Sequence, residues 1–230
     1  MKQLLSILCL GLFCAACSKV DKHTMYLSGT VDGLKKGTLF LQQIADSSLI
    51  TLDSLEIRGS GDFTFEVPMK TPQLCYLYLE KADNNDINDR LSFFGEKGNI
   101  SIRTSWDQFD SGAEVVGSKS HQLYSEYQEM MSEFNKKDLM LAQAAIGLQD
   151  TVKIDSIEKL SKHNFVSRYR YLLHFALTNT SSYVTPFVTV IDGTAANPIY
   201  LDSIHRSLPD SIANSPYGKK LALMVGETNN

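Results

Sequence analysis

The chain of 230 residues has a formal net charge of −4, and 43% of its residues are hydrophobic. This apolar fraction is close to the globular average, so the chain can bury the core of one large domain or two small ones. A mildly acidic chain without a basic stripe is a poor binder of nucleic acid, and no polybasic segment suits it to anionic lipid. We therefore expect no nucleic-acid partner.

The first 17 residues have the pattern of a bacterial lipoprotein signal. Lys2 gives a positive start, residues 4–13 are mostly apolar, and small alanines stand before a cysteine. The pattern predicts a signal peptide over residues 1–16, cleavage between Ala16 and Cys17, and a fatty acyl group such as palmitate on Cys17. A transmembrane anchor needs about 20 apolar residues and is disfavoured. Secretion without a lipid is the alternative.

After cleavage, residues 17–23 are expected to form a lipidated tether to a membrane. Ser18 is compatible with sorting to the outer membrane, and the tether lacks a strongly acidic run. We therefore expect an outer-membrane lipoprotein of the cell envelope that faces the periplasm rather than the cell surface. The lipid alone would hold it there.

Cysteine usage limits the redox chemistry that we expect. Cys9 and Cys14 leave with the signal peptide and Cys17 carries the lipid, so Cys75 is the remaining thiol. We expect neither an internal disulfide nor Cys-x-x-Cys chemistry in the mature protein. Cys75 lies in the apolar run 74–79, which favours a buried strand cysteine over a reactive or partner-pairing thiol.

Alternating apolar residues and recurrent turn residues predict a β-rich domain over residues 24–117. The expected strands are 25–31, 38–44, 49–57, 63–67, 74–79, 90–94 and 99–103. Short strands at this spacing predict an antiparallel β-sandwich or a rolled sheet.

Over residues 118–230 the apolar period becomes that of a helix. We expect a helical region of four or five helices and therefore an α+β fold. Gly147 and Asp150 mark the break between two long helices. Further helix starts are indicated by Asn197-Pro198, by Ser215-Pro216, and by Ser182 for a short helix to residue 190.

Each long helix has an apolar stripe. The two stripes are Leu123, Tyr127, Met130, Met131 and Phe134, and Phe165, Tyr169, Leu172, Leu173 and Ala176. Such stripes are most often core faces, and a ligand groove or a dimer seam is the alternative.

Few residues suggest a metal site. The loop of residues 83–89 has a calcium-like composition, but Ile87 stands where an oxygen ligand is needed and Gly95 replaces the closing glutamate. A solvated strand connection is therefore favoured. The five histidines (His23, His121, His163, His174 and His205) have no partner at i+3 or i+4. We expect no metal and no cofactor.

The sequence contains no Gly-x-Ser-x-Gly elbow, no P-loop and no Gly-x-Gly-x-x-Gly motif. Ser60 lies in a predicted turn, and Asp53-Ser54 fits strand-edge hydrogen bonding better than catalysis. Paired carboxylates of the glycosidase type stay an open alternative, because sequence does not reveal spatial pairing. We expect no catalytic residues and no enzyme activity.

Turn glycines and alternating apolar residues recur in several segments, namely Leu27-Ser28-Gly29-Thr30-Val31, residues 36–41, 52–54 and 61–65, Glu96-Lys97-Gly98-Asn99-Ile100 and Val116-Gly117-Ser118. This pattern resembles the β-rich N-terminal domain of unknown function in lipoproteins of Gram-negative gut anaerobes. In that family, helices and then a thioredoxin-like module of the thiol–disulfide oxidoreductase or AhpC/TSA (peroxiredoxin-related) type usually follow. The printed sequence, which stops where that module usually begins, contains no Trp-Cys-x-x-Cys segment, and Trp106 is far from any cysteine. We therefore expect no redox residues of the family here.

These observations favour a non-catalytic binding or interaction module with a protein or peptide partner in the envelope. One alternative, implied by the resemblance alone, is an accessory to a thiol–disulfide or peroxide-handling system with a separate thioredoxin-like partner. The other is a hydrolase-like enzyme whose site is assembled from residues distant in sequence.

Overall fold

A computed structural model describes residues 23–45, 48–81 and 89–228 of the chain. The predicted signal peptide, the cleavage and lipidation positions Ala16 and Cys17, and residues 83–88 of the calcium-like loop lie outside this range. None of the described helices is long and apolar enough to cross a membrane.

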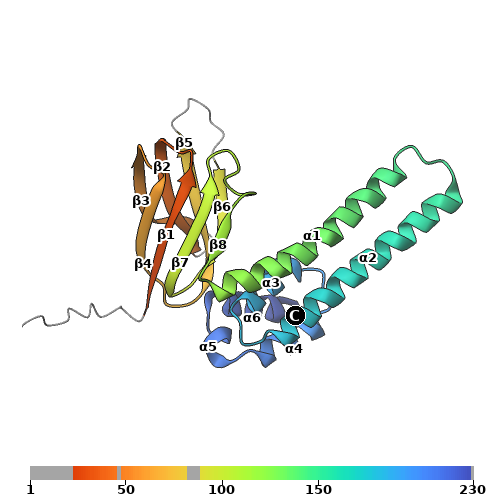
Figure 1. The fold of residues 1–230 in the computed structure, drawn as a ribbon. Coiled ribbons are helices and arrows are strands. Elements are labelled where there is room, and N and C mark those ends of the chain that lie inside the picture. The colour runs from red at the N-terminus through yellow and green to blue at the C-terminus, as the bar shows by residue number, and fades with distance from the viewer. Residues whose placement is uncertain (1–22, 46–47, 82–88, 229–230) are drawn as a thin grey trace, which may run out of the picture.

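The N-terminal part is a sandwich of two four-stranded sheets, followed by six helices in the described residues, so the fold is α+β as predicted (Figure 1). The sheets have the orders β4-β1-β7-β8 and β3-β2-β5-β6. The strands are β1 Thr24–Asp32, β2 Lys36–Ala45, β3 Ser48–Arg58, β4 Asp62–Pro68, β5 Gln73–Lys81, β6 Asp89–Gly95, β7 Gly98–Ser105 and β8 Glu114–Val116.

The alternation of apolar residues places one face of each sheet in a shared core. In β4, Phe63, Phe65 and Val67 are buried while the residues between them are exposed. They pack with side chains of the other sheet such as Leu39 and Leu77, which are fully buried. Not every pairing is antiparallel, because β1 pairs with β4 antiparallel but with β7 parallel.

The helices are α1 Lys119–Ala145, α2 Thr151–Thr178, α3 Val184–Asp192, α4 Pro198–Ser207, α5 Asp210–Ala213 and α6 Pro216–Thr228. α1 and α2 form a long hairpin that projects away from the sandwich, while the shorter helices gather at its base (Figure 1). At 1.5 Å per residue, each arm of the hairpin is about 40 Å long.

Capping side chains begin the helices where the sequence predicted them. Ser118 accepts the amide hydrogen of His121 at 2.9 Å, and Asp150 accepts that of Val152 at 3.0 Å. Asn197 plays the same role for Ile199, and Ser215 plays it for Gly218. Ser182 also accepts an amide hydrogen, that of Val184, but the N-cap residue of α3 is Tyr183, which makes no side-chain cap hydrogen bond.

Glu96, in the turn between β6 and β7, attaches the hairpin to the sandwich. Its carboxylate accepts the backbone amide of Lys119 at 2.7 Å and the hydroxyl of Ser120 at 2.5 Å. A carboxylate at the first turn of a helix satisfies free amide groups and complements the helix dipole. The direction of α1 is therefore set by bonds to the sheet.

A second core lies between the outer face of the β3-β2-β5-β6 sheet and the helices. Phe94 of β6 is fully buried there, and its ring lies 5.3 Å from those of Tyr124 in α1 and Phe187 in α3. Such edge-to-face aromatic contacts stabilise beyond the buried area alone. Phe94 thus joins the two parts of the chain.

The structure differs from the sequence predictions in a few places. β8 and α5 were not predicted, since three-residue and four-residue elements show no period. Two stripe residues are not core: Met130 is 43% exposed and Phe165 is 51% exposed. Met130 lies at the edge of its stripe on the outside of α1, and Phe165 is the member of its stripe nearest the outer half of the hairpin.

Candidate functional site

The hairpin is held together by a narrow seam with a spacing of four and three residues. On α1 the seam residues are Tyr127, Met131, Phe134, Asp138 and Leu141, and on α2 they are Ile157, Ser161, Asn164, Arg168, Tyr171 and Phe175; all are buried or half-buried. This alternation is the pattern of two-stranded coiled-coil packing. The seam is apolar next to the sandwich and polar around Asp138, Ser161 and Asn164, and it ends with the half-buried Leu141 and Ile157.

Asn164 is the centre of the polar part of the seam. It is 1% exposed, and its amide group donates to the backbone carbonyl of Phe134 at 3.0 Å and to Asp138 at 2.6 Å. The guanidinium of Arg168 lies 4.0 Å from the same carboxylate. A buried amide with satisfied bonds fixes the register of two helices.

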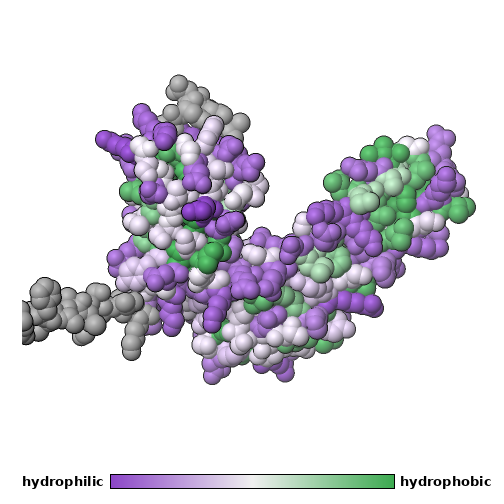
Figure 2. Space-filling view, in the orientation of Figure 1, coloured by the Kyte–Doolittle hydropathy of each residue, from purple (hydrophilic) through white to green (hydrophobic). Residues whose placement is uncertain are grey.

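The outer half of the hairpin, residues 132–163, contains no buried residue, although the structure describes all of it. It nevertheless exposes large apolar side chains. They are Leu139, Met140, Ile146, Val152 and Leu160, with exposed fractions between 48% and 79%. Figure 2 shows this apolar surface gathered at the far end of the hairpin. Contiguous apolar surface of this kind marks interaction sites.

A groove of about 260 Å³ lies between α1, α2 and α3 at the base of the hairpin. The hydroxyl of Tyr127 donates to Asp192 at 2.9 Å within it. Burial, followed by the charge of Asp192, raises the pKa of Tyr127, and burial raises that of Tyr124 to about 12. The groove is smaller than a typical small-molecule site of about 300–1,000 Å³. It has the size for one side chain of a partner.

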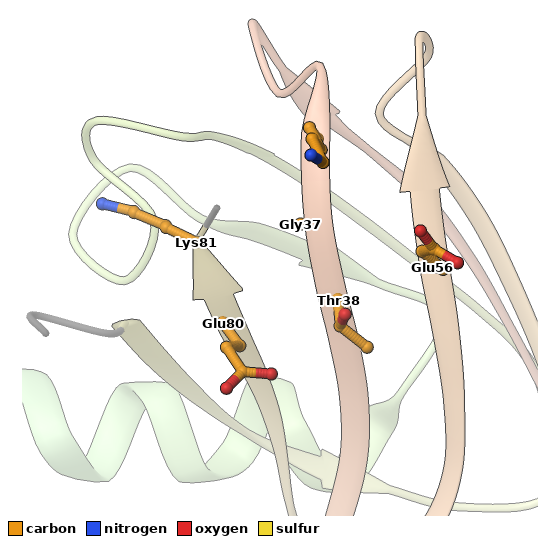
Figure 3. A pocket seen from close by; sticks show the side chains of 6 residues that line it. Gly37, Thr38, Glu56, Glu80 and Lys81 are labelled. Atoms are coloured by element: carbon orange, nitrogen blue, oxygen red, sulfur yellow. The ribbon is translucent and has the colours of Figure 1, made fainter. Parts of the chain in front are cut away.

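A charged depression of about 200 Å³ lies on the outer face of the β3-β2-β5-β6 sheet (Figure 3). Glu56 of β3 and Glu80 of β5 both pair with Thr38 of the strand between them. Two strand spacings separate the backbones of Glu56 and Glu80 by about 9.5 Å across the sheet.

Inverting glycosidases use two carboxyl groups about 6.5–9.5 Å apart, one as general acid and one as general base, and Glu56 does not fit the role of the acid. Arg58 makes two hydrogen bonds to Glu56, at 2.8 and 2.9 Å, and they lower the pKa of that carboxyl. A general acid needs the opposite shift, and Glu56 is held ionised.

The sheet edges are a weaker candidate for partner binding. β3 is a long edge strand with Leu49 and Ile50 exposed. However, its pairing with β2 shifts between Leu41 and Gln42, so that Leu52 has no partner. Such a bulge twists an edge and hinders the addition of a further strand.

The structure places the sequence-derived candidates apart from one another. Cys75 is a buried strand cysteine, as predicted, and burial raises its pKa to about 12. Ser60 donates to Asp62 at 2.6 Å in a turn, and the amide of Ser54 is bonded to Asp53 at 2.7 Å. No described group of three His, Cys, Asp or Glu side chains could hold a metal ion.

His121 has a structural environment. Its Nδ1 accepts the backbone amide of Phe94 at 3.4 Å, so the proton lies on Nε2, which donates to Ser125 at 3.2 Å. Burial lowers the pKa of His121 and so favours the neutral form of the ring. The imidazole helps to hold α1 against β6.

The sandwich is the part of the chain that matches a known protein family. Residues 25–124 match the family model described as a domain of unknown function, DUF4369. The DUF4369 match covers both sheets and the first turns of α1, and it supports the predicted domain of unknown function. No curated protein and no solved structure matched the chain.

The hairpin surface lies outside the DUF4369 match, and the sequence pattern did not single it out. The apolar residues of its outer half have the spacing of an ordinary core helix. One signal could have revealed it: no charged residue occurs between Asp138 and Asp150.

Proposed function

We propose that the protein is a non-catalytic interaction module of the cell envelope, with the α1–α2 hairpin as its binding arm. The lipid on Cys17 would hold it on the outer membrane, facing the periplasm, and its partner would be a protein or peptide. The observation that carries the proposal is the outer half of the hairpin, where apolar side chains are exposed and none is buried.

Simple physical chemistry supports a partner at this surface. Fully burying a Leu, Ile, Val or Met side chain contributes about 1.5–3 kcal/mol. Leu139, Met140, Ile146 and Val152 are each at least 60% exposed, so most of this contribution is still available to a partner. Helices commonly bind partners through such apolar anchors.

Two further observations support a role without catalysis. The carboxylate of Glu56 is neutralised by Arg58, and the thiol of Cys75 is sealed in the core between the sheets. Glu56 is exposed, but its lowered pKa does not suit a general acid, and the buried Cys75 with its raised pKa does not suit a nucleophile.

Photo-crosslinking in cells tests the binding arm. A photoreactive amino acid at Met140, which is 68% exposed, should give a protein adduct that mass spectrometry identifies. The matched control is the same amino acid at Thr64, an exposed residue on the DUF4369 sandwich. Adducts from Thr64 but none from Met140 would show that the hairpin is not the binding arm.

Fatty-acid labelling tests the tether separately. The native chain should incorporate a clickable palmitate and sediment with membranes, while Cys17→Ser should lose both properties and Cys75→Ser should keep them. Membrane retention of the Cys17→Ser variant would refute the lipid anchor.

A further inference from the structure

A second stripe with coiled-coil spacing runs along the outside of α1. It consists of Glu126, Met130, Glu133, Lys137, Met140 and Ala144, all exposed. The steps of four, three, four, three and four residues are those of a helix–helix seam. Yet no described element of the chain covers this face. Met130 is 43% exposed and Met140 is 68% exposed.

The stripe is complementary to itself in the antiparallel direction. If two copies of α1 pack around a two-fold axis midway between Glu133 and Lys137, each Glu133 faces Lys137 of the other copy. Each Met130 then faces Met140. The Glu133 side chain is 62% exposed despite its 2.6 Å ion pair with Lys136, so it can accept a second cation. A parallel arrangement would place like charges together.

We propose that a second copy of this chain docks on the outer face of α1 in this antiparallel register. The inference rests on the proposed role of the hairpin as a binding arm and names its partner. Two-fold symmetric contacts of this kind bury the same patch on both copies. The Met pair supplies apolar contact, and the Glu–Lys pairs select the direction and register.

A cleft at the sandwich end of the stripe fits the partner's hairpin tip. It measures about 420 Å³ and lies between β8 and the first turns of α1, with Ala113, Val115 and Val116 among its lining residues. Val116 is 66% exposed. Figure 2 shows the molecule hollowed between the sandwich and the hairpin.

The proposed register brings the partner's tip to this cleft. With Met130 opposite Met140, Ile146 of the second copy comes level with the first turns of α1, whose His121, Gln122 and Ser125 line the cleft. Ile146 is 79% exposed, and the side chain would be covered there together with Val116. The interface thus pairs Met130 with Met140 on each side of a middle that pairs opposite charges, and Glu126 of each copy faces Ala144 of the other at its ends.

Charge reversal tests the register directly in the full-length chain in a mild detergent. Glu133→Lys and Lys137→Glu each turn two attractive contacts into two like-charge contacts, which should raise the dimer dissociation constant about tenfold or more. An equimolar mixture of the two variants restores both opposite-charge pairs and should dimerise like the native chain. Lys162→Glu, an equal charge change on α2, is the control and should leave dimerisation unchanged.

The measurements are sedimentation and disulfide trapping in membranes. Met130→Cys and Met140→Cys chains with different tags should form a mixed disulfide when expressed together, and each alone should form little. A native chain that stays monomeric at high concentration overturns the proposal. So does a mixture that does not regain the dimer.

Two outcomes would identify a different occupant of the stripe and also overturn the proposal. If the chain is monomeric and floats with phospholipid vesicles, and if Ile146→Asp abolishes this flotation, then the tip of the hairpin binds lipid. A photo-crosslink from Met140 to another protein, with no dimer, would refute the second copy while supporting the proposed binding arm. No adduct at all from Met140 in cells would count against the proposed function itself.

Discussion

Phe94 gives the sharpest test of how the sandwich and the helices are joined. Replacing Phe94 with Ala removes a fully buried ring that contacts Tyr124 and Phe187. Truncating a buried Phe costs about 3–5 kcal/mol, including the cavity that is left behind. With a urea dependence of about 2.5 kcal/mol/M for a chain of this size, the denaturation midpoint should fall by about 1.6 M.

The control is Phe40→Ala on β2 of the same sheet. Phe40 is half-buried and contacts the ring of Tyr78 at 5.9 Å, but it does not reach the helices. Its loss should cost about 1–1.5 kcal/mol. Urea denaturation followed by far-ultraviolet circular dichroism compares the two variants. Equal midpoints for Phe94→Ala and Phe40→Ala would refute the argument that the helices depend on Phe94 for their attachment.

Three further predictions concern the sandwich and its contact with α1. Gly29→Ala should lower the free energy of unfolding by about 3 kcal/mol in a urea titration, because the added Cβ would lie 2.0 Å from the backbone oxygen of Ile102. The control is Gly226→Ala, which has open space for the Cβ and should not destabilise the protein. Because burial raises the pKa of Cys75 to about 12 from 9.0, a maleimide should label this thiol about a thousandfold more slowly in the native protein than in urea, and rapid native labelling would contradict the burial. Burial lowers the pKa of His121, so the unfolded chain binds its proton more readily and thermal stability should fall as the pH drops below 6.5. His121→Asn, which keeps an acceptor for the Phe94 amide, should flatten that pH dependence, and an unchanged slope would refute the role of the imidazole.

The sandwich could be predicted because its information is local. Alternation and turn residues located seven of the eight strands, within two residues at each end. What alternation does not contain is the order of the strands. The parallel pairing of β1 with β7 joins residues more than 70 positions apart, such as Met25 and Gly98, and only tertiary packing specifies it.

The candidate site could not be predicted for a related reason. A helical stripe reports that apolar residues share a face, but it does not report whether another element covers that face. Tyr127 and Met130 both fitted one predicted stripe. The structure turns Tyr127 toward α2, where it is 2% exposed, and leaves Met130 outside. Glu96, which fixes the start of α1, was missed because its partners lie 23 and 24 residues away.

The exposed apolar residues of the hairpin do not pack in its seam, so folding of the hairpin alone does not explain their presence. Most helical stability in proteins comes from packing of an apolar face, but the outer seam places Asp138, Ser161 and Asn164 beside only two apolar seam residues, Leu141 and Ile157. The three polar residues specify register and contribute little hydrophobic stabilisation. The apolar side chains that could have strengthened the seam, such as Met140 and Leu139, point outward. A partner that covered the exposed apolar side chains would therefore add stability that the polar part of the seam does not supply.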